Sequence, residues 1–190
     1  MTDFMEFRWH GRGGQGTVTA AKLLAETMLG NGKYVQAFPE YGPERMGAPV
    51  KAYNRISDHL LTIHCQVTHP KVVIVVDPTL IGVVDILEGV PEDGIVIINT
   101  PKSADEMRKR LKAGRRKVYT VDATKISIET LGRPMPNTPM LGALARATNE
   151  VGIDALLEQV RKNFSKKFNP KVIEANIKGI ERAYQEVQEG

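Results

Sequence analysis

Apolar residues fall into two recurring patterns along the chain, which predict an alternation of strands and helices. Short runs that are apolar on both faces are typical of buried parallel strands, and we expect such strands at 71–77, 95–98 and 117–121. Apolar residues spaced three and four positions apart predict a helix at 17–29. A basic helix is expected at 104–112, and further helices at 140–150, 154–163 and 171–187. Strands and helices therefore alternate through the middle of the chain, and its end is helical.

The first predicted strand, 4–10, differs from a buried parallel strand. Met5, Phe7 and Trp9 alternate with polar residues, so one face of the strand is apolar and the other is polar. The polar face has two explanations that the sequence leaves open: a misjudged or partly exposed strand end, or a face that meets a ligand or another chain. Further strands are expected at 34–38, 50–56 and 60–67, the last two joined by a turn.

A glycine-rich loop joins the first strand to the first helix, with the sequence Gly11-Arg12-Gly13-Gly14-Gln15-Gly16. Its spacing matches the dinucleotide fingerprint, in which glycine lets backbone N–H groups and a helix N-terminus approach phosphate oxygens. Arg12 adds a positive charge. The alternative is a tight turn that binds nothing. With the alternation of elements, the loop predicts one Rossmann-like α/β domain over 1–190, with a doubly wound, mostly parallel sheet and a helical C-terminal section.

The residues after the second predicted strand disfavour a classical nicotinamide cofactor. Nicotinamide enzymes usually place an acidic residue at the end of that strand to hold the ribose. Here the strand ends in Gln36-Ala37-Phe38-Pro39, and the nearest acid, Glu40, follows the proline. We therefore expect the loop to bind another anion, with a stand-alone NAD(P)-binding protein as an alternative reading.

Charge permits an anionic ligand or an acidic partner. The 190 residues carry a net charge of +4, which does not by itself indicate nucleic-acid binding, and no nucleic acid is expected. A nucleic-acid or regulatory module is a third reading. It rests on the densest basic cluster, which we expect to be solvated surface or a docking patch for an acidic partner: Arg108, Lys109, Arg110, Lys112, Arg115, Arg116 and Lys117.

Cysteine and histidine content excludes several kinds of site. Cys65 is the only cysteine, so no internal disulfide can form and a cytoplasmic location is expected. His59, His64 and His69 recur every five residues, which alternates faces on a strand, and no metal site is expected. No apolar run is long enough to cross a bilayer, so no membrane association is expected.

Three motifs, in order along the chain, resemble the gamma subunit of the 2-oxoacid:ferredoxin oxidoreductases. The first is the glycine loop with its preceding His10 and the following Ala20-Ala21-Lys22-Leu23-Leu24-Ala25. The second is Tyr41-Gly42-Pro43-Glu44-Arg45-Met46-Gly47-Ala48-Pro49-Val50, and the third is Asn137-Thr138-Pro139-Met140-Leu141-Gly142-Ala143. The resemblance spans nearly the whole chain.

The resemblance implies an enzyme complex that oxidatively decarboxylates a 2-oxoacid, transfers the acyl group to coenzyme A and passes electrons to ferredoxin. It implies alpha, beta and often delta subunits as partners. Iron–sulfur clusters need about four thiolates, and Cys65 supplies one. With the resemblance, this places the clusters, thiamine diphosphate and Mg in the partner subunits as an expectation, and no catalytic residue is expected in this chain.

By the same resemblance, the Gly11–Gly16 loop is expected to bind coenzyme A, and the residues of second choice are Tyr41, Pro43, Glu44 and Arg45. Asn137 and the run 140–143 are expected to cap and pack a helix against a partner subunit. The order Arg45-Met46-Gly47-Ala48-Pro49 is most similar to the pyruvate branch, with 2-oxoisovalerate, 2-oxoglutarate and indolepyruvate as alternative substrates.

Overall fold

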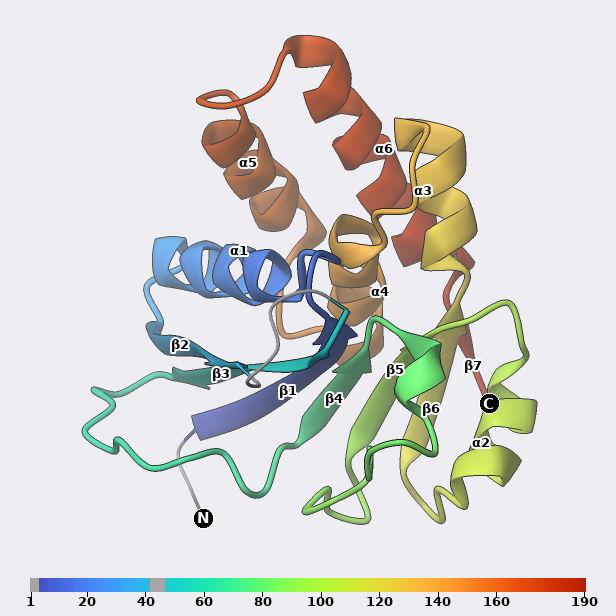
Figure 1. The fold of residues 1–190 in the computed structure, drawn as a ribbon. Coiled ribbons are helices and arrows are strands. Elements are labelled where there is room, and N and C mark those ends of the chain that lie inside the picture. Colours follow the sequence, from blue (N-terminus) through green and yellow to red (C-terminus); the bar gives the residue numbers. More distant parts are fainter. Residues whose placement is uncertain (1–3, 42–46) are drawn as a thin grey trace.

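A computed structural model describes residues 4–41 and 47–190. Within these ranges a single mixed sheet has the strand order β2-β3-β1-β4-β5-β6-β7 (Figure 1). Strands β1, β4, β5 and β6 are parallel, and β2, β3 and β7 run antiparallel to their neighbours. The strands are β1 Phe4–Arg12, β2 Tyr34–Tyr41, β3 Pro49–Ser57, β4 Val72–Val75, β5 Ile95–Asn99, β6 Lys117–Val121 and β7 Gln188–Glu189.

Helices cover both faces of the sheet, which confirms the predicted doubly wound α/β fold (Figure 1). Helices α1 and α4 pack on one face, with α3, α5 and α6 further out, and α2 covers the other face. The helices are α1 Thr17–Gly30, the 3-10 helix η1 Pro78–Leu80, α2 Ala104–Leu111, α3 Ala123–Leu131, α4 Asn137–Thr148, α5 Ile153–Phe164 and α6 Pro170–Glu186.

Strand β4 shows why the continuous apolar runs form central strands. Its four residues are fully buried, and alternate residues enter opposite cores. Val72 and Ile74 pack in the core beneath α1 and α4, whereas Val73 and Val75 pack in the core beneath η1 and α2. A strand with helices on both sides needs apolar side chains in both directions.

The polar face of β1 is buried by the chain itself, although β1 lies between β3 and β4 in the middle of the sheet. Arg8 and His10 are 3% and 1% exposed. The Arg8 guanidinium donates to the carbonyls of Ile86 and Glu88 at 3.0 and 2.8 Å, and its Nε donates to Nε2 of His10 at 2.9 Å. The β4–β5 connection therefore covers the polar face of β1, and this face is not a solvent-exposed strand end.

The expected strand at 60–67 is wrong. Both edges of β3 are already paired, one with β1 and the other with β2, so β3 has no free edge for a following hairpin strand. Segment 60–67 instead runs without regular structure and is tied down by side chains of the sheet. Gln36 donates to the carbonyl of Ile63, and Arg55 donates to that of Cys65, each at 2.9 Å.

Strand β2 extends past its expected end at residue 38 to Tyr41 and includes Pro39. Proline is tolerated there because β2 is the edge strand of the sheet and one side of it needs no N–H donor. Helix α3 was not predicted from the apolar pattern. Its start is marked by Asp122, whose carboxylate accepts the backbone N–H of Lys125 at 2.9 Å, and its end by Gly132 with φ of 72°.

Candidate functional site

The glycine loop lies at a topological switch point of the sheet. The chain leaves β1 for α1 on one face, and leaves the adjacent parallel strand β4 for η1 on the other face. Connections that diverge in this way leave a crevice beyond the carboxyl ends of the strands, where open α/β sheets bind their ligands. The fold therefore puts the sequence-predicted loop where a ligand site is expected.

Two glycines of the loop are required by their conformation. Gly14 and Gly16 have φ of 94° and 74°, in the left-handed region that disfavours other residues. A Cβ on Gly16 would also lie 2.5 Å from Nδ2 of Asn137, and a Cβ on Gly11 would lie 2.0 Å from Oγ1 of Thr17. The loop is therefore packed tightly against the starts of both α1 and α4.

The N-terminus of α1 is open to an anion. Its N-cap is Gly16, which provides no side-chain cap, and its first turn carries no acidic residue. The first N–H groups of a helix have no intrahelical partner and carry partial positive charge. Oγ1 of Thr17 is buried and has no hydrogen-bond partner within the described ranges. An orphaned hydroxyl beside free N–H groups is consistent with a site for phosphate oxygens.

Arg12 is already engaged by its neighbours. Its Nε lies 3.3 Å from Oδ2 of Asp77, and Nη1 donates to the carbonyl of Gly47 at 2.9 Å. Gln15 donates to the same Asp77 oxygen at 2.6 Å. Burial alone would raise the pKa of Asp77, but hydrogen bonds from Thr79 and Gln15 and the charge of Arg12 outweigh it and hold this pKa below its usual range. Asp77, which sequence reasoning did not identify, is thus ionised at neutral pH.

The second motif reaches the glycine loop through its last residues. Gly13 donates its N–H to the carbonyl of Ala48 at 3.0 Å, and Gly47 donates to the carbonyl of Gly13 at 3.4 Å. Tyr41 ends β2, where it pairs with Val50. The expected binding residues Pro43, Glu44 and Arg45 lie outside the described residues, as does the side chain of Tyr41.

The third motif forms α4, which differs from the expectation for it. Helix α4 packs against α6 of the same chain, in place of a partner subunit, and all ten residues 137–145 and 147 are buried. A Cβ on Gly142 would lie 2.0 Å from the carbonyl oxygen of Ile180, so glycine is needed for this close approach. Asn137 is the first residue of the helix and not its cap; it lies beside Gly16 at the ligand side of the sheet.

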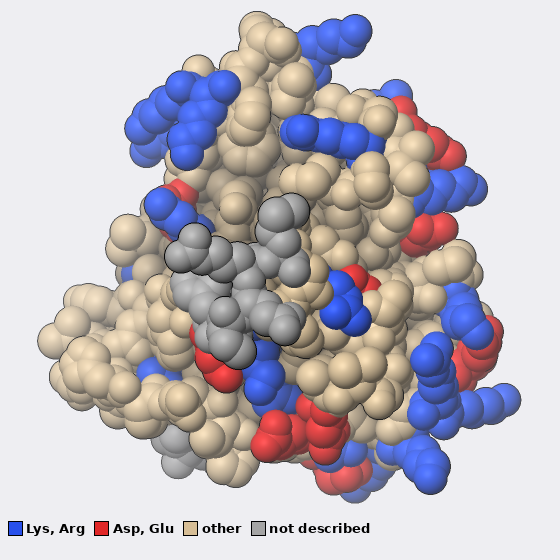
Figure 2. Space-filling view, in the orientation of Figure 1, with Lys and Arg blue, Asp and Glu red and all other residues tan. Residues whose placement is uncertain are grey.

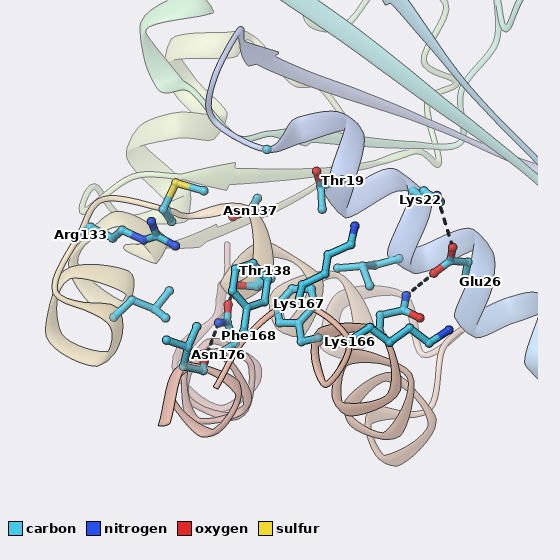
Figure 3. A pocket seen from close by; sticks show the side chains of 17 residues that line it. Thr19, Lys22, Glu26, Arg133, Asn137, Thr138, Lys166, Lys167, Phe168 and Asn176 are labelled. Atoms are coloured by element: carbon cyan, nitrogen blue, oxygen red, sulfur yellow. Dashed lines mark hydrogen bonds and ion pairs between the residues drawn. The ribbon is translucent and has the colours of Figure 1, made fainter. Parts of the chain in front are cut away.

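A pocket of about 420 Å³ opens next to the glycine loop, and Gly16 and Asn137 belong to its wall. This volume is within the range of about 300–1,000 Å³ that small-molecule pockets occupy. Figure 3 shows α1, the α3–α4 connection and the α5–α6 connection around it, with Lys167 reaching toward Thr19 and Arg133 at the opposite end. The apolar wall consists of Leu23, Leu131, Met135, Phe164, Phe168 and Val172.

The rim of the pocket is strongly basic. Its lining includes four basic residues, Lys22, Arg133, Lys166 and Lys167, against the single acid Glu26. Of the basic residues, Lys22 lies 3.8 Å from Glu26, whereas the other three form no ion pair with any residue in the described ranges. Basic side chains flank the upper part of the molecule in Figure 2, where α5 and α6 lie in Figure 1. Uncompensated cations beside an apolar wall favour an anionic ligand with an apolar part.

The basic cluster at 108–117 is partly structural. Arg108 donates to the carbonyls of Gly114 and Arg116 at 3.0 and 2.9 Å. Arg116 donates to the carbonyl of Val90 at 2.7 Å and lies 3.3 Å from Glu92. These two arginines therefore hold the chain around α2.

The described ranges contain neither a cluster of three metal-ligating side chains nor a membrane-spanning helix. In 4–41 and 47–190, no three His, Cys, Asp or Glu side chains gather where they could hold a metal ion. Nor does any helix of these ranges combine the length and apolarity needed to cross a bilayer.

Comparisons with known proteins match nearly the whole chain. The family described as pyruvate ferredoxin/flavodoxin oxidoreductase matches residues 6–186. The pyruvate synthase subunit PorC of Thermotoga maritima is 48% identical over 185 residues, which are 97% of this chain and 95% of that protein. Its crystal structure superimposes with a TM-score of 0.88 at 44% identity, over 100% of this chain and 99% of the other.

Two other relatives extend the comparison. The pyruvate/ketoisovalerate oxidoreductases common subunit gamma of Pyrococcus abyssi is 47% identical over 184 residues, 97% of both chains. A 2-oxoglutarate:ferredoxin oxidoreductase from Magnetococcus marinus, solved with 2-oxoglutarate, coenzyme A and succinyl-CoA bound, has a TM-score of 0.79. At 17% identity, over 97% of this chain and 31% of that one, it shows the shared fold alone.

Fold and site define an α/β protein with a glycine-rich loop at the switch point of its sheet. The comparisons assign it further: the chain belongs to the pyruvate ferredoxin/flavodoxin oxidoreductase family. This confirms the resemblance carried by the three sequence motifs, and the relatives in this family are named as subunits.

Proposed function

We propose that this chain is the gamma subunit of a pyruvate:ferredoxin oxidoreductase and that it holds coenzyme A between the glycine loop and the adjacent basic pocket. The observation that carries the proposal is the position of Gly16, which caps α1 and also lines the pocket. A single ligand can therefore contact the helix N-terminus and the basic rim together.

The residues present fit the chemistry of coenzyme A. Its phosphates need hydrogen-bond donors and positive charge, which the N-terminus of α1 and the side chains of Lys166 and Lys167 can supply. Its adenine needs an apolar surface, and Phe168 is 41% exposed at the pocket. Coenzyme A supplies the thiol that accepts the acyl group, and this chain binds and orients it.

The rest of the reaction belongs to partner subunits in this proposal. Thiamine diphosphate, Mg and the iron–sulfur clusters would be held by alpha, beta and delta subunits, which pass electrons to ferredoxin. The names of the relatives support pyruvate as the 2-oxoacid, with ketoisovalerate as the second candidate because the Pyrococcus subunit is named for both.

A stand-alone NAD(P)-binding function is less well supported by the sheet. In the dinucleotide fold the strand after the first helix is parallel to β1 and next to it, and its end carries the ribose-binding acid. Here β2 lies at the edge of the sheet, separated from β1 by the antiparallel strand β3. Among the described residues, the antiparallel strand β3 occupies this side of β1, so no parallel strand ends there to hold the ribose.

The test is the Michaelis constant for coenzyme A in the assembled complex. Replacing Lys166 and Lys167 together by Gln removes two charges from the pocket rim. We expect the KM for coenzyme A to rise by about 10-fold or more, because each lost phosphate contact is worth about 1 kcal/mol or more. The KM for pyruvate should stay unchanged.

The matched control removes the same charge elsewhere. Lys109 and Arg110 are exposed on α2, on the opposite face of the sheet, and both are replaced by Gln. The control should leave the KM for coenzyme A at the wild-type value. An unchanged KM in the pocket variant, or an equal rise in both variants, would reject the pocket as the binding site.

A further inference from the structure

Asp77 follows β4 at the point where the carboxyl ends of β1 and β4 meet, and it is 6% exposed. Its two carboxylate oxygens make separate contacts. Oδ1 accepts the backbone N–H of Thr79 at 2.9 Å and its hydroxyl at 2.7 Å, which caps η1. Oδ2 contacts residues of the glycine loop, Gln15 at 2.6 Å and Arg12 at 3.3 Å. Oδ1 therefore caps the local 3-10 turn, and Oδ2 binds the glycine loop.

A cap alone does not explain a carboxylate at this position. Ser, Thr and Asn cap helices about as well as Asp, and none of them brings a second negative oxygen. The contacts of Oδ2 with Gln15 and Arg12 lie more than sixty positions away in the sequence. The amide of Gln15 and the charged guanidinium of Arg12 both need an acceptor here. Asp supplies a second, negatively charged oxygen for them, and the other capping residues do not.

Gln15 transmits the position of Asp77 to the backbone of the loop. Its Nε2 donates to Asp77, while its Oε1 accepts the backbone N–H of Arg12 at 2.7 Å. The carboxylate therefore fixes which way the amide of Gln15 faces. The result is a continuous chain of hydrogen bonds from the end of β4 to the end of β1.

The Arg12 guanidinium is held by hydrogen bonds that leave some of its N–H donors unused in the described ranges. Arginine has five N–H donors. Its Nε and Nη2 donate to Oγ1 of Thr79 at 3.2 and 3.1 Å, and Nη1 donates to Gly47. Within the described ranges these contacts use three donors and leave two, and the side chain is 30% exposed. The guanidinium is thus oriented before any ligand arrives and can still bind an anion.

We propose that Asp77 is a positioning residue for the glycine loop, which orients Gln15 and the guanidinium of Arg12 so that a phosphate of coenzyme A meets a preformed site. The inference rests on the proposed coenzyme A function of this loop. Fixing a flexible arginine in advance lowers the entropy cost of ordering it when the ligand binds. Asp77 itself does not contact the ligand.

The test is Asp77→Asn in the assembled complex. Asn keeps an oxygen to cap η1, but its amide hydrogens then face the donors of Gln15 and Arg12. We expect the KM for coenzyme A to rise about tenfold, equivalent to about 1.4 kcal/mol. The value of kcat at saturating coenzyme A and the KM for pyruvate should change by less than about twofold, because only binding of this ligand is affected.

A double-mutant cycle separates positioning from a general structural role. In an Arg12→Ala background, Asp77→Asn should raise the KM for coenzyme A by a smaller factor than in the wild type, because one of the two residues through which Asp77 acts is gone. Gln15→Met breaks the contact with Oδ2 without touching Asp77 and should reproduce the selective rise in KM, which covers the case that Asp77→Asn fails to assemble. The proposal would be overturned if the effects of Asp77→Asn and Arg12→Ala on this KM were fully additive. It would also be overturned if Asp77→Asn and Gln15→Met lowered the melting temperature but left the KM for coenzyme A unchanged.

The outcomes distinguish this inference from the function on which it rests. If Arg12→Ala and the pocket variants all leave the KM for coenzyme A unchanged, the proposed binding site is wrong. If those variants raise this KM while Asp77→Asn and Gln15→Met do not, the binding site stands and the positioning role of Asp77 is wrong.

Discussion

Gly16 joins the glycine loop to two helices, and its substitution tests how tightly the site is built. Its φ of 74° costs a non-glycine residue about 1–2 kcal/mol, and a Cβ would approach the side chain of Asn137 to 2.5 Å. Gly14 has φ of 94° but an open space around its Cβ position. We expect Gly16→Ala to lower the free energy of unfolding more than Gly14→Ala, by about 1 kcal/mol or more in urea titrations. Equal losses would show that Asn137 does not confine the loop.

His10 gives the protein a predictable dependence on pH. Burial, with the charges of Arg8 and Lys51, lowers the pKa of His10 to about 3, whereas an unfolded histidine titrates near 6.5. Between these values the folded state binds fewer protons than the unfolded state. The contribution of neutral His10 to the free energy of unfolding is therefore fully present above pH 6.5 and is lost as the pH falls toward 3. The loss is about 2 kcal/mol between pH 7 and pH 5.

The measurement is the free energy of unfolding of the wild type and of His10→Gln at pH 7 and pH 5. Gln can still accept the N–H of Arg8 but cannot be protonated in this range. The free energy of unfolding of His10→Gln should therefore fall less between pH 7 and pH 5 than that of the wild type. Identical slopes for both proteins would mean that His10 is not the group that titrates.

Residue-scale features of the site were predictable only where a local motif encodes them. The spacing of Gly11, Gly13 and Gly16 predicts the loop because a strand–loop–helix turn needs glycine at such positions. Asp77 carries no such signal, since its role comes from contacts with Gln15 and Arg12 that only the fold creates. For the same reason Arg12 looked like a free charge in the sequence, whereas the structure shows it already bound on one side.

At the scale of elements, α4 illustrates how a motif can have a structural meaning within the chain. The backbone of α4 at Gly142 approaches the backbone of α6 so closely that a Cβ would lie 2.0 Å from the carbonyl of Ile180. We expect Gly142→Ala to lower the free energy of unfolding by about 1–3 kcal/mol, because backbone must move to admit the methyl group.

The matched control for this prediction is Gly30→Ala, at the end of α1. A Cβ there meets nothing within 4 Å, so only helix propensity changes, by about 1 kcal/mol at most and in the stabilising direction. Chemical denaturation of the two variants provides the comparison. Equal stability of both would contradict the close contact between α4 and α6.

Elements with strong periodicity were predictable, and those fixed by tertiary contacts were not. Strands β4, β5 and β6 follow from apolar runs that two helical layers require. The expected strand at 60–67 failed because alternation describes a strand but says nothing of a free edge to pair with. Helix α3 is short, and its signals lie in its caps more than in its apolar pattern.

At the scale of the whole molecule, the sequence predicts the fold class but not the strand order. The pairing of β3 between β2 and β1 brings together segments whose proximity no local pattern encodes. The same holds for the basic pocket, which takes residues from α1, the α3–α4 connection and the α5–α6 connection. The motifs led to the family, whereas the pocket and the place of Asp77 needed the structure.

The most direct test of the central claim is anaerobic affinity purification of this chain from its native cell, with identification of the co-purifying subunits and an activity assay. We predict a brown complex that reduces ferredoxin only when pyruvate and coenzyme A are both present, while the chain alone is inactive. A colourless chain without stable partners, or ferredoxin reduction that does not depend on coenzyme A, would contradict it.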